Sequence, residues 1–244
     1  MAVKRVCLFL LLCGGYAAVS AAELTLQSGP QQTVMIELYT SEGCNSCPPA
    51  ERYLNDFVTD KQLWTTYIPL AFHVDYWDYL GWRDRFATAA NTQRQQDYGK
   101  VRQARTIYTP EFFVNGREWR RGLFGHLPSV SPQQVGTLKV LLRDTQLNAT
   151  FHSTHTQTRA LQLDVAILGM DLVSDIRAGE NAGRHAAHQF TVLGHKTVTS
   201  NTAQWQTSIP AIGDHAASRQ ALVVWVSAIG DPAPLQATGG FIPQ

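Results

Sequence analysis

The sequence predicts an α/β domain over residues 31–145, followed by a small all-β, sandwich-like domain over residues 148–244. Three observations lead to this fold class. A strand, a helix and a second strand follow one another between residues 34 and 74, which is the order of a parallel crossover unit. A later apolar stretch ends in Asn115-Gly116, a dipeptide typical of hairpin turns. In the last third of the chain, helical spacing disappears and apolar residues alternate with polar ones, as in half-buried strands.

The crossover unit begins at Val34–Thr40, which is almost entirely apolar, as expected of a strand that is buried on both faces. Pro48 and Pro49 follow a short loop. Proline suits the first turn of a helix, because the N–H group that it lacks has no partner there. We therefore expect a helix from Pro48 and a second parallel strand over residues 67–74.

Two further helices are predicted in the first domain. The polar stretch 83–105 is rich in Gln, Arg and Ala and favours a helical insertion over the sheet. Ser131 is a suitable N-cap and Pro132 a suitable first helical residue. An apolar stripe follows at helical spacing and predicts a helix that ends near Asp144; its members are Val135, Leu138, Leu141 and Leu142.

The second domain is predicted from strict alternation. Apolar side chains occupy every second position from Leu161 to Ile167, so one face of this strand is expected to be buried. Further strands are expected near Phe190–Leu193 and Leu222–Val226. Glycine and proline separate these segments, which favours a small sandwich.

Residues 1–22 have the layout of a secretory signal peptide. Lys4 and Arg5 precede an apolar run, and small residues at 20–22 provide a cleavage site. An uncleaved membrane anchor is the alternative, but the apolar run falls short of the roughly 20 residues that span a bilayer. We therefore expect an exported protein, periplasmic or secreted, with no membrane span after cleavage.

The charge balance restricts the partners. The 20 basic and 19 acidic residues nearly cancel. A nucleic-acid-binding domain would show a clear excess of basic residues, so no nucleic-acid partner is expected. No glycine-rich phosphate-binding loop follows a predicted strand, so no organic cofactor is expected either.

The cysteines carry the clearest chemical signal. Cys7 and Cys13 lie in the predicted signal peptide, which leaves Cys44 and Cys47 as a Cys-x-x-Cys pair between a strand and a helix. A helix N-terminus favours a thiolate, so Cys44 is expected to be the nucleophile in disulfide exchange. We expect Cys44 to be the more exposed thiol, while Cys47 is shielded and resolves the mixed disulfide.

Three other interpretations of this pair stay open. A bridge across so few residues stabilises a fold little, but it can be purely structural. The pair can be an inert remnant of a redox fold. A zinc site would need two more ligands, for which the first domain offers only His73 and His126. Histidine clusters in the second domain do not have a specific ligand spacing, so no metal site is assigned; they are His152 with His155, and His185 with His188.

Residues 37–48, together with Thr109-Pro110 and the strand that follows, resemble the thioredoxin superfamily. The resemblance implies a cis bond before Pro110, beside a redox-active Cys44–Cys47 disulfide. It also implies that Glu37 corresponds to a buried acid that relays a proton during exchange. An edge-exposed or salt-bridged glutamate is the alternative. The dipeptide Asn45-Ser46 differs from that of thioredoxin itself.

Four motifs narrow the resemblance to one exported bacterial family. YTSEGC at 39–44, CPPA at 47–50, FHVDYWDYLGW at 72–82 and GENAGR at 179–184 are similar to the family known as domain of unknown function 1223. This resemblance covers nearly all of the chain after the signal peptide. It implies a fold and assigns no reaction.

The sequence therefore predicts a thiol–disulfide oxidoreductase that acts on a protein or a small thiol or disulfide. Aromatic residues after the second strand lie where ligands bind in α/β sheets, although packing against the core is the alternative for them. Two alternatives for the function are a soft-metal, copper carrier and a non-catalytic interaction module. The predicted catalytic residues are Cys44, Cys47 and Glu37, and the predicted substrate-binding residues are Thr109, Pro110 and Trp77.

Overall fold

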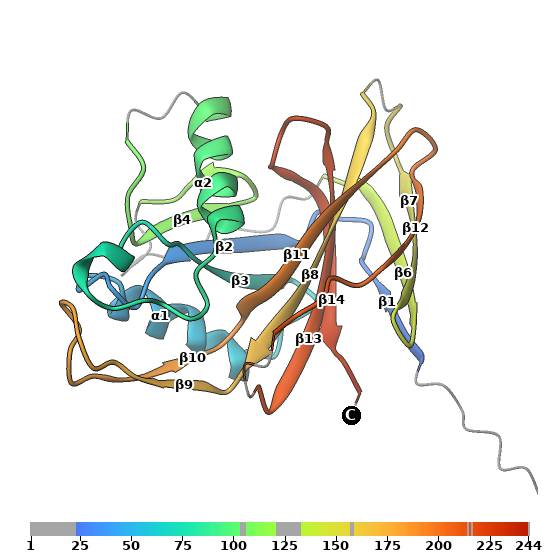
Figure 1. Cartoon of the computed structure of the whole chain (residues 1–244). Helices are drawn as coiled ribbons and strands as arrows, with labels where there is room; N and C mark the ends of the chain where they lie inside the picture. The colour runs from blue at the N-terminus through green and yellow to red at the C-terminus, as the bar shows by residue number, and fades with distance from the viewer. Residues whose placement is uncertain are drawn as a thin grey trace, which may run out of the picture.

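The computed structural model describes residues 23–102, 106–120, 133–156, 159–213, 215 and 217–243. Within these ranges the chain is a mixed α/β protein with two α-helices and three β-sheets (Figure 1). The predicted signal peptide lies outside the described residues. No helix in the described part is long and apolar enough to cross a membrane. The elements are β1 Glu23–Gln27, β2 Val34–Thr40, α1 Pro48–Asn55, β3 Tyr67–His73, α2 Ala89–Arg102, β4 Glu111–Val114, β5 Arg117–Glu118, β6 Gly136–Arg143, β7 Gln146–Ser153, β8 Leu161–Met170, β9 Leu172–Asp175, β10 His185–His188, β11 Thr191–Ser200, β12 Gln204–Ser208, β13 Arg219–Ala228 and β14 Pro234–Phe241, with short 3₁₀ turns at Asp56–Thr59 and Asp78–Leu80.

The largest sheet has eight strands in the order β14-β13-β8-β11-β3-β2-β4-β5. The pair β2 and β3 is parallel along its whole length, and α1 makes the crossover between the two strands. Strand β11 joins β3 in parallel through Thr191 and Ala71. The sheet therefore continues from the first half of the chain into the second.

The two helices cover opposite faces of β2 and β3 (Figure 1). On β2, the Thr40 hydroxyl donates to Glu51 of α1, whereas Glu37 accepts from Arg94 of α2. Side chains an odd number of positions apart on a strand point to opposite faces, so these contacts separate the two sides of the sheet. All seven residues of β2 are buried, as the continuous apolar pattern predicted.

A second, antiparallel sheet has the order β1-β6-β7-β12 and packs against one face of the large sheet (Figure 1). Alternate residues of β6 and β7 point into the space between the sheets, as period-two patterning requires. The same core receives the odd-numbered residues of β8 from Leu161 to Ile167, which the sequence predicted as a buried face. Apolar side chains from both sheets therefore form one shared core.

Most predicted elements of the first half are confirmed. Strands β2 and β3, helix α1 from Pro48 and strand β4 lie where the sequence placed them. Asn115 and Gly116 both have positive φ angles, as a tight hairpin turn between β4 and β5 requires. Helix α2 covers Ala89–Arg102, so the predicted helix over 83–105 is right in its centre but starts too early.

The predicted helix from Pro132 to Asp144 is wrong. Residues 136–143 form strand β6, which pairs with both β1 and β7. Leu138, Val140 and Leu142 are buried at every second position, and this alternation overrides the helical spacing of the other leucines. The predicted domain boundary at 145–148 falls at the turn between β6 and β7 and the start of β7.

The third sheet is a two-stranded hairpin of β9 and β10 that lies beside α1 (Figure 1). It is attached to α1 by a hydrogen bond from the Asn55 side chain to the carbonyl of Ala187. The turn of this hairpin contains Gly179 and Gly183, both with positive φ angles that suit glycine. The hairpin thus carries residues from the second half of the chain to the start of the first helix.

Candidate functional site

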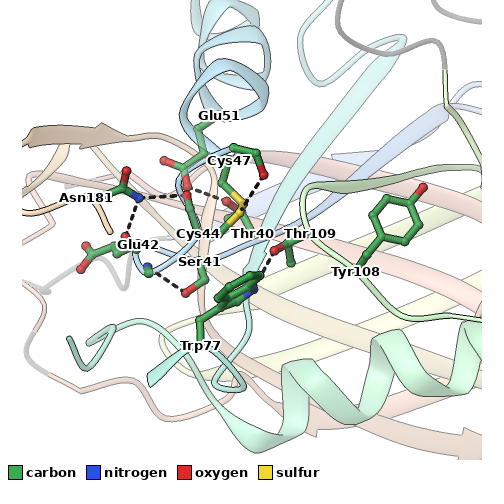
Figure 2. The surroundings of a disulfide bond; sticks show 12 residues. Thr40, Ser41, Glu42, Cys44, Cys47, Glu51, Trp77, Tyr108, Thr109 and Asn181 are labelled. Carbon is green, nitrogen blue, oxygen red and sulfur yellow. Dashed lines mark hydrogen bonds between the residues drawn. A yellow bond between two sulfur atoms is a disulfide. The ribbon is translucent and has the colours of Figure 1, made fainter. Parts of the chain in front are cut away.

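Cys44 and Cys47 form a disulfide immediately before helix α1 (Figure 2). The loop that holds them is a pair of tight turns, in which the Cys44 amide donates to Ser41 and the Cys47 amide donates to Cys44. Cys47 is the N-cap residue of α1. The two cysteines are 1 % and 0 % exposed, so the expected greater exposure of Cys44 is not seen in the oxidised protein.

Helix α1 supplies fewer donors to the disulfide than its position suggests. Its first two residues are Pro48 and Pro49, which have no N–H group, and the Ala50 amide already donates to the Cys47 carbonyl. The side-chain partner of the disulfide is the hydroxyl of Ser46, which lies 3.4 Å from Cys44 Sγ. A Cys44 thiolate would therefore depend on nearby charges and hydroxyls as well as on the helix.

Trp77 and Thr109 lie beside the disulfide (Figure 2). The Trp77 indole N–H donates to the Thr109 hydroxyl at 2.7 Å. Trp77 also packs on Gly43, where an added Cβ would lie only 3.0 Å from the Trp77 Cβ. The bond between Thr109 and Pro110 is cis, as predicted from the sequence. The structure thus places two predicted substrate-binding residues, Trp77 and Thr109, beside the predicted nucleophile Cys44.

Asn181, in the turn of the β9–β10 hairpin, fixes the cysteine loop from the other side (Figure 2). Its side-chain amide donates to the carbonyls of Glu42 and Cys44, at 2.8 and 2.9 Å. Asn181 is 1 % exposed. Because buried carbonyls need partners, this one side chain links the conformation of the loop to that of the hairpin.

A group of buried charged residues lies next to the cysteine loop. His188 of β10 is placed between two carboxylates, with Nε2 at 3.2 Å from Glu42 and Nδ1 at 3.1 Å from Glu51. Glu51 follows Cys47 by one helical turn and also accepts from the Thr40 hydroxyl. The Trp82 indole donates to Glu42. These contacts join the loop, α1 and the hairpin in one network.

The contacts within this network favour the ionised carboxylate of Glu51 and the protonated ring of His188. Burial alone would raise the pKa of Glu51, but the contact with His188 outweighs it and lowers the pKa to about 2. Burial would likewise lower the pKa of His188, but Glu42 and Glu51 raise it to about 10. In the absence of a bound cation, His188 is therefore an imidazolium between two carboxylates.

His73 extends the network at the end of β3. Its Nδ1 lies 2.6 Å from the carboxylate of Asp84, which also accepts from the Glu42 amide. The His73 ring packs edge-on against the ring of His188. Both histidines are at most 2 % exposed. His73 and His188 therefore meet although they are far apart in the sequence.

Glu37 lies on the other face of the sheet from this network. Its carboxylate forms a buried ion pair with Arg94 Nε at 2.8 Å and accepts from the hydroxyls of Tyr98 and Tyr39. Arg94 and Tyr98 both belong to α2, and the pairing is the salt-bridged alternative that the sequence left open. Thus Glu37 contacts α2, whereas Glu51 contacts the cysteine helix α1.

A pocket of about 330 Å³ opens between α1 and the β9–β10 hairpin. Glu42, Glu51 and His188 line it on the side of the network, and Arg52 and Arg184 line it further out. The pocket provides a route from solvent to the network. His185, which the sequence grouped with His188, is exposed and contacts Asp175 instead.

Several residues of the site had no assigned role in the sequence analysis: Glu42, Glu51, Asp84 and Asn181. Glu42 and Asn181 lie within motifs that carried the family resemblance, so those motifs were the available signal. Glu51 lies four positions after Cys47 on the predicted helix, a spacing that places the two on one face. His126, one of the possible ligands considered, lies outside the described residues.

The fold and the site define a mixed α/β protein with a Cys-x-x-Cys disulfide at the start of a helix. Residues 35–227 match the protein family of unknown function DUF1223, and the chain belongs to this family. The family predicted from the sequence motifs is therefore confirmed. No curated protein matches the sequence.

Two solved structures share the fold. The crystal structure of protein AGR_C_4864 from Agrobacterium tumefaciens superimposes with a TM-score of 0.62 at 22% identity, covering 89% of this chain and 97% of that one. HBP35 of Porphyromonas gingivalis superimposes with a TM-score of 0.57 at 14% identity, covering 87% and 76%. At these identities the similarity concerns the fold alone.

Proposed function

We propose that this protein is an exported thiol–disulfide oxidoreductase whose first half is a thioredoxin-like domain. The observation that carries the proposal is the Cys44–Cys47 disulfide at the junction of a strand and a helix, next to Thr109 and Trp77 (Figure 2). Strand β2, helix α1 and strand β3 form the parallel unit that the superfamily uses to place such a pair. An oxidising compartment would maintain the disulfide.

The proposed reaction exchanges one disulfide for another. In the reducing direction, the Cys44 thiolate attacks a substrate disulfide, forms a mixed disulfide and releases the first substrate thiolate, which takes up a proton. The Cys47 thiol then loses its proton and attacks Cys44 Sγ, so the second substrate thiolate leaves and the Cys44–Cys47 bond reforms. The protein is oxidised by two electrons and the substrate disulfide is reduced to two thiols. The oxidising direction runs through the same steps in reverse.

The surroundings support roles for the predicted substrate-binding residues. Trp77 is half-buried and rests on the cysteine loop, and Pro110 is partly exposed beside buried Thr109. We propose that this edge receives the chain or small molecule that carries the reacting sulfur. Because the disulfide itself is almost fully covered, the residues around it would have to shift before a substrate sulfur reaches Cys44.

Trapping experiments test the assignment. The wild-type protein, reduced and then mixed with a model aromatic disulfide, is expected to release two equivalents of aromatic thiol and reform its own disulfide. Cys47→Ser should release one equivalent and keep the other as a mixed disulfide, which peptide mass spectrometry should locate on Cys44. Cys44→Ser should react much more slowly. A stable adduct on Cys47, or equal reactivity of both variants, would overturn the assigned roles.

The reduction potential tests the direction. Oxidised and reduced protein are equilibrated in glutathione buffers, and the thiol content is measured after acid quenching. A potential near −270 mV, roughly that of thioredoxin, indicates a reductant, while about −120 mV indicates an oxidant. A disulfide that stays oxidised in every buffer would contradict the redox function and support a structural bridge. Copper bound by the reduced pair at one equivalent, without exchange activity, would support the carrier function instead.

A further inference from the structure

The buried network beside the disulfide contains an unused ligand atom. His73 is 0 % exposed, and its Nδ1 is taken by Asp84 at 2.6 Å. Its other ring nitrogen, Nε2, is buried and has no hydrogen-bond partner among the described residues. A buried polar atom without a partner is costly, and a native protein with such an atom calls for an explanation.

We propose that Glu51, His73 and His188 bind a divalent first-row transition-metal ion, such as Zn²⁺. The three side chains each offer one ligand atom, and these atoms lie within 4.8 Å of one another. Two imidazoles and one carboxylate form an established ligand set for zinc, with a fourth position open to water or a substrate. The cysteines are not needed, so this site differs from a copper site on the Cys-x-x-Cys pair.

Asp84 is positioned to orient the His73 ring toward the metal. Histidines that bind metals usually donate their second ring N–H to a carboxylate, which fixes the ring and increases its basicity. The 2.6 Å contact between Asp84 and His73 Nδ1 has this geometry and leaves Nε2 for the metal. Asp84 is itself held by the amides of Glu42 and Phe86, so its position is well defined.

The charge balance also favours a cation. The network contains the buried carboxylates of Glu42 and Asp84 and the partly buried one of Glu51, and its cations are limited to the two histidines among the described contacts. A divalent ion would place positive charge among these three carboxylates.

The pocket between α1 and the β9–β10 hairpin gives access, since Glu51 and His188 are among its lining residues. Bonds of 2.0–2.1 Å would place tetrahedral ligand atoms about 3.3 Å apart, closer than the 4.8 Å limit seen here. Glu51 Oε2 and His188 Nδ1 already lie 3.1 Å apart, so metal binding would need little movement between α1 and β10. Because Cys47 precedes Glu51 by one turn, the ion would lie one helical turn from the disulfide.

Metal binding to the oxidised protein tests the site. Purified protein is stripped with chelator, oxidised and titrated with Zn²⁺ or Co²⁺, and the bound metal is measured by elemental analysis and by the visible absorption of Co²⁺. We expect one equivalent in the wild type and in Cys44→Ser/Cys47→Ser. His73→Gln and His188→Gln should bind at least tenfold more weakly, and Asp84→Asn should lose 10–100-fold as an orienting residue.

His185→Gln is the matched control, because His185 is on the same strand, is exposed and forms its ion pair with Asp175 rather than with the network. It should bind like the wild type. Circular dichroism and urea unfolding of each metal-free variant establish whether it folds. If a histidine variant does not fold, measurements on the wild type still test the proposed site. These are the metal stoichiometry, the Co²⁺ spectrum and the rise in unfolding temperature with Zn²⁺.

No stoichiometric binding to the oxidised wild type would overturn the proposal. Binding that requires the reduced cysteines, or that His185→Gln abolishes, would overturn it equally. The test is independent of disulfide exchange, because the trapping experiment needs no metal and the titration needs no thiol. A failure of one therefore leaves the other result intact.

Discussion

Replacement of Glu37 by Gln tests whether this residue on the α2 face of the sheet stabilises the fold or takes part in disulfide exchange. The Glu37 carboxylate and Arg94 form an ion pair in which the two side chains are 1 % and 7 % exposed. Tyr98 and Tyr39 also donate to the carboxylate. The substitution keeps the size and one acceptor oxygen but leaves Arg94 as a buried cation without its counter-charge.

The expected loss follows from this burial. Removal of one partner of a buried ion pair typically costs about 3–5 kcal/mol of unfolding free energy. Since the glutamine amide oxygen would still accept from Tyr98, we expect the lower end, about 3 kcal/mol. With a urea m-value of roughly 2 kcal/mol/M, the unfolding midpoint should fall by about 1.5 M. Urea unfolding of the oxidised protein measures this directly.

Asp97→Asn is the control on the same helix. Asp97 pairs with Lys100, but these side chains are 48 % and 67 % exposed, and such pairs contribute about 0–1 kcal/mol. If Glu37→Gln and Asp97→Asn unfold at the same urea concentration, the Glu37–Arg94 ion pair does not stabilise the fold and the prediction is wrong.

The same variant tests the proton role that the sequence predicted for Glu37. If Glu37 acted as the general base, its loss would slow resolution of the mixed disulfide on Cys44 by about 10²–10⁴-fold, the usual contribution of such a base. Glu37 lies on the α2 face, so we expect the stopped-flow resolution rate of folded Glu37→Gln to change less than tenfold. Slower resolution with unchanged stability would instead support the catalytic role.

Three further predictions follow from single contacts. Asn181→Ala removes two buried hydrogen bonds to the cysteine loop, so it should lower the free energy of unfolding by about 1–3 kcal/mol and speed reduction of the disulfide by dithiothreitol. Asn201→Ala, at an exposed position, should change neither quantity. Burial raises the pKa of Glu111 to about 7, so the folded state holds its proton more tightly than the unfolded state. Stability should therefore fall from pH 4.5 to 7, and urea unfolding of Glu111→Gln should show a flatter profile; identical profiles would refute this. Gly43→Ala places a Cβ 3.0 Å from Trp77, so the indole should move and the disulfide should become easier to reduce, which an unchanged reduction rate would exclude.

The sequence predicted the first half of the fold well, because its signals are local. Val34–Thr40 is continuously apolar, two prolines mark the start of α1, and Asn115-Gly116 marks the hairpin. The cis bond at Pro110 followed from a family resemblance. The strand at 136–143 was missed because Leu141 and Leu142 complete a helical stripe, while pairing with β1 and β7 decides the outcome.

The site was predicted only in part, since half of it depends on contacts between distant segments. Cys44 and Cys47 are recognisable from their spacing. His188, by contrast, had the same local signal as His185, and only the position of the hairpin separates a buried partner of two carboxylates from an exposed residue. The exposure of Cys44 was also misjudged, because this cysteine is 1 % exposed within the folded loop.

The β9–β10 hairpin brings residues of the second half of the chain to the cysteine loop of the first half. It carries Asn181, which holds the cysteine loop, and His188, which lies between Glu42 and Glu51. A shift of this hairpin would uncover two carbonyls of the loop and separate a buried cation from its carboxylates at the same time. Opening the disulfide to a substrate and rearranging the charged network are therefore expected to be one coupled motion rather than two independent ones.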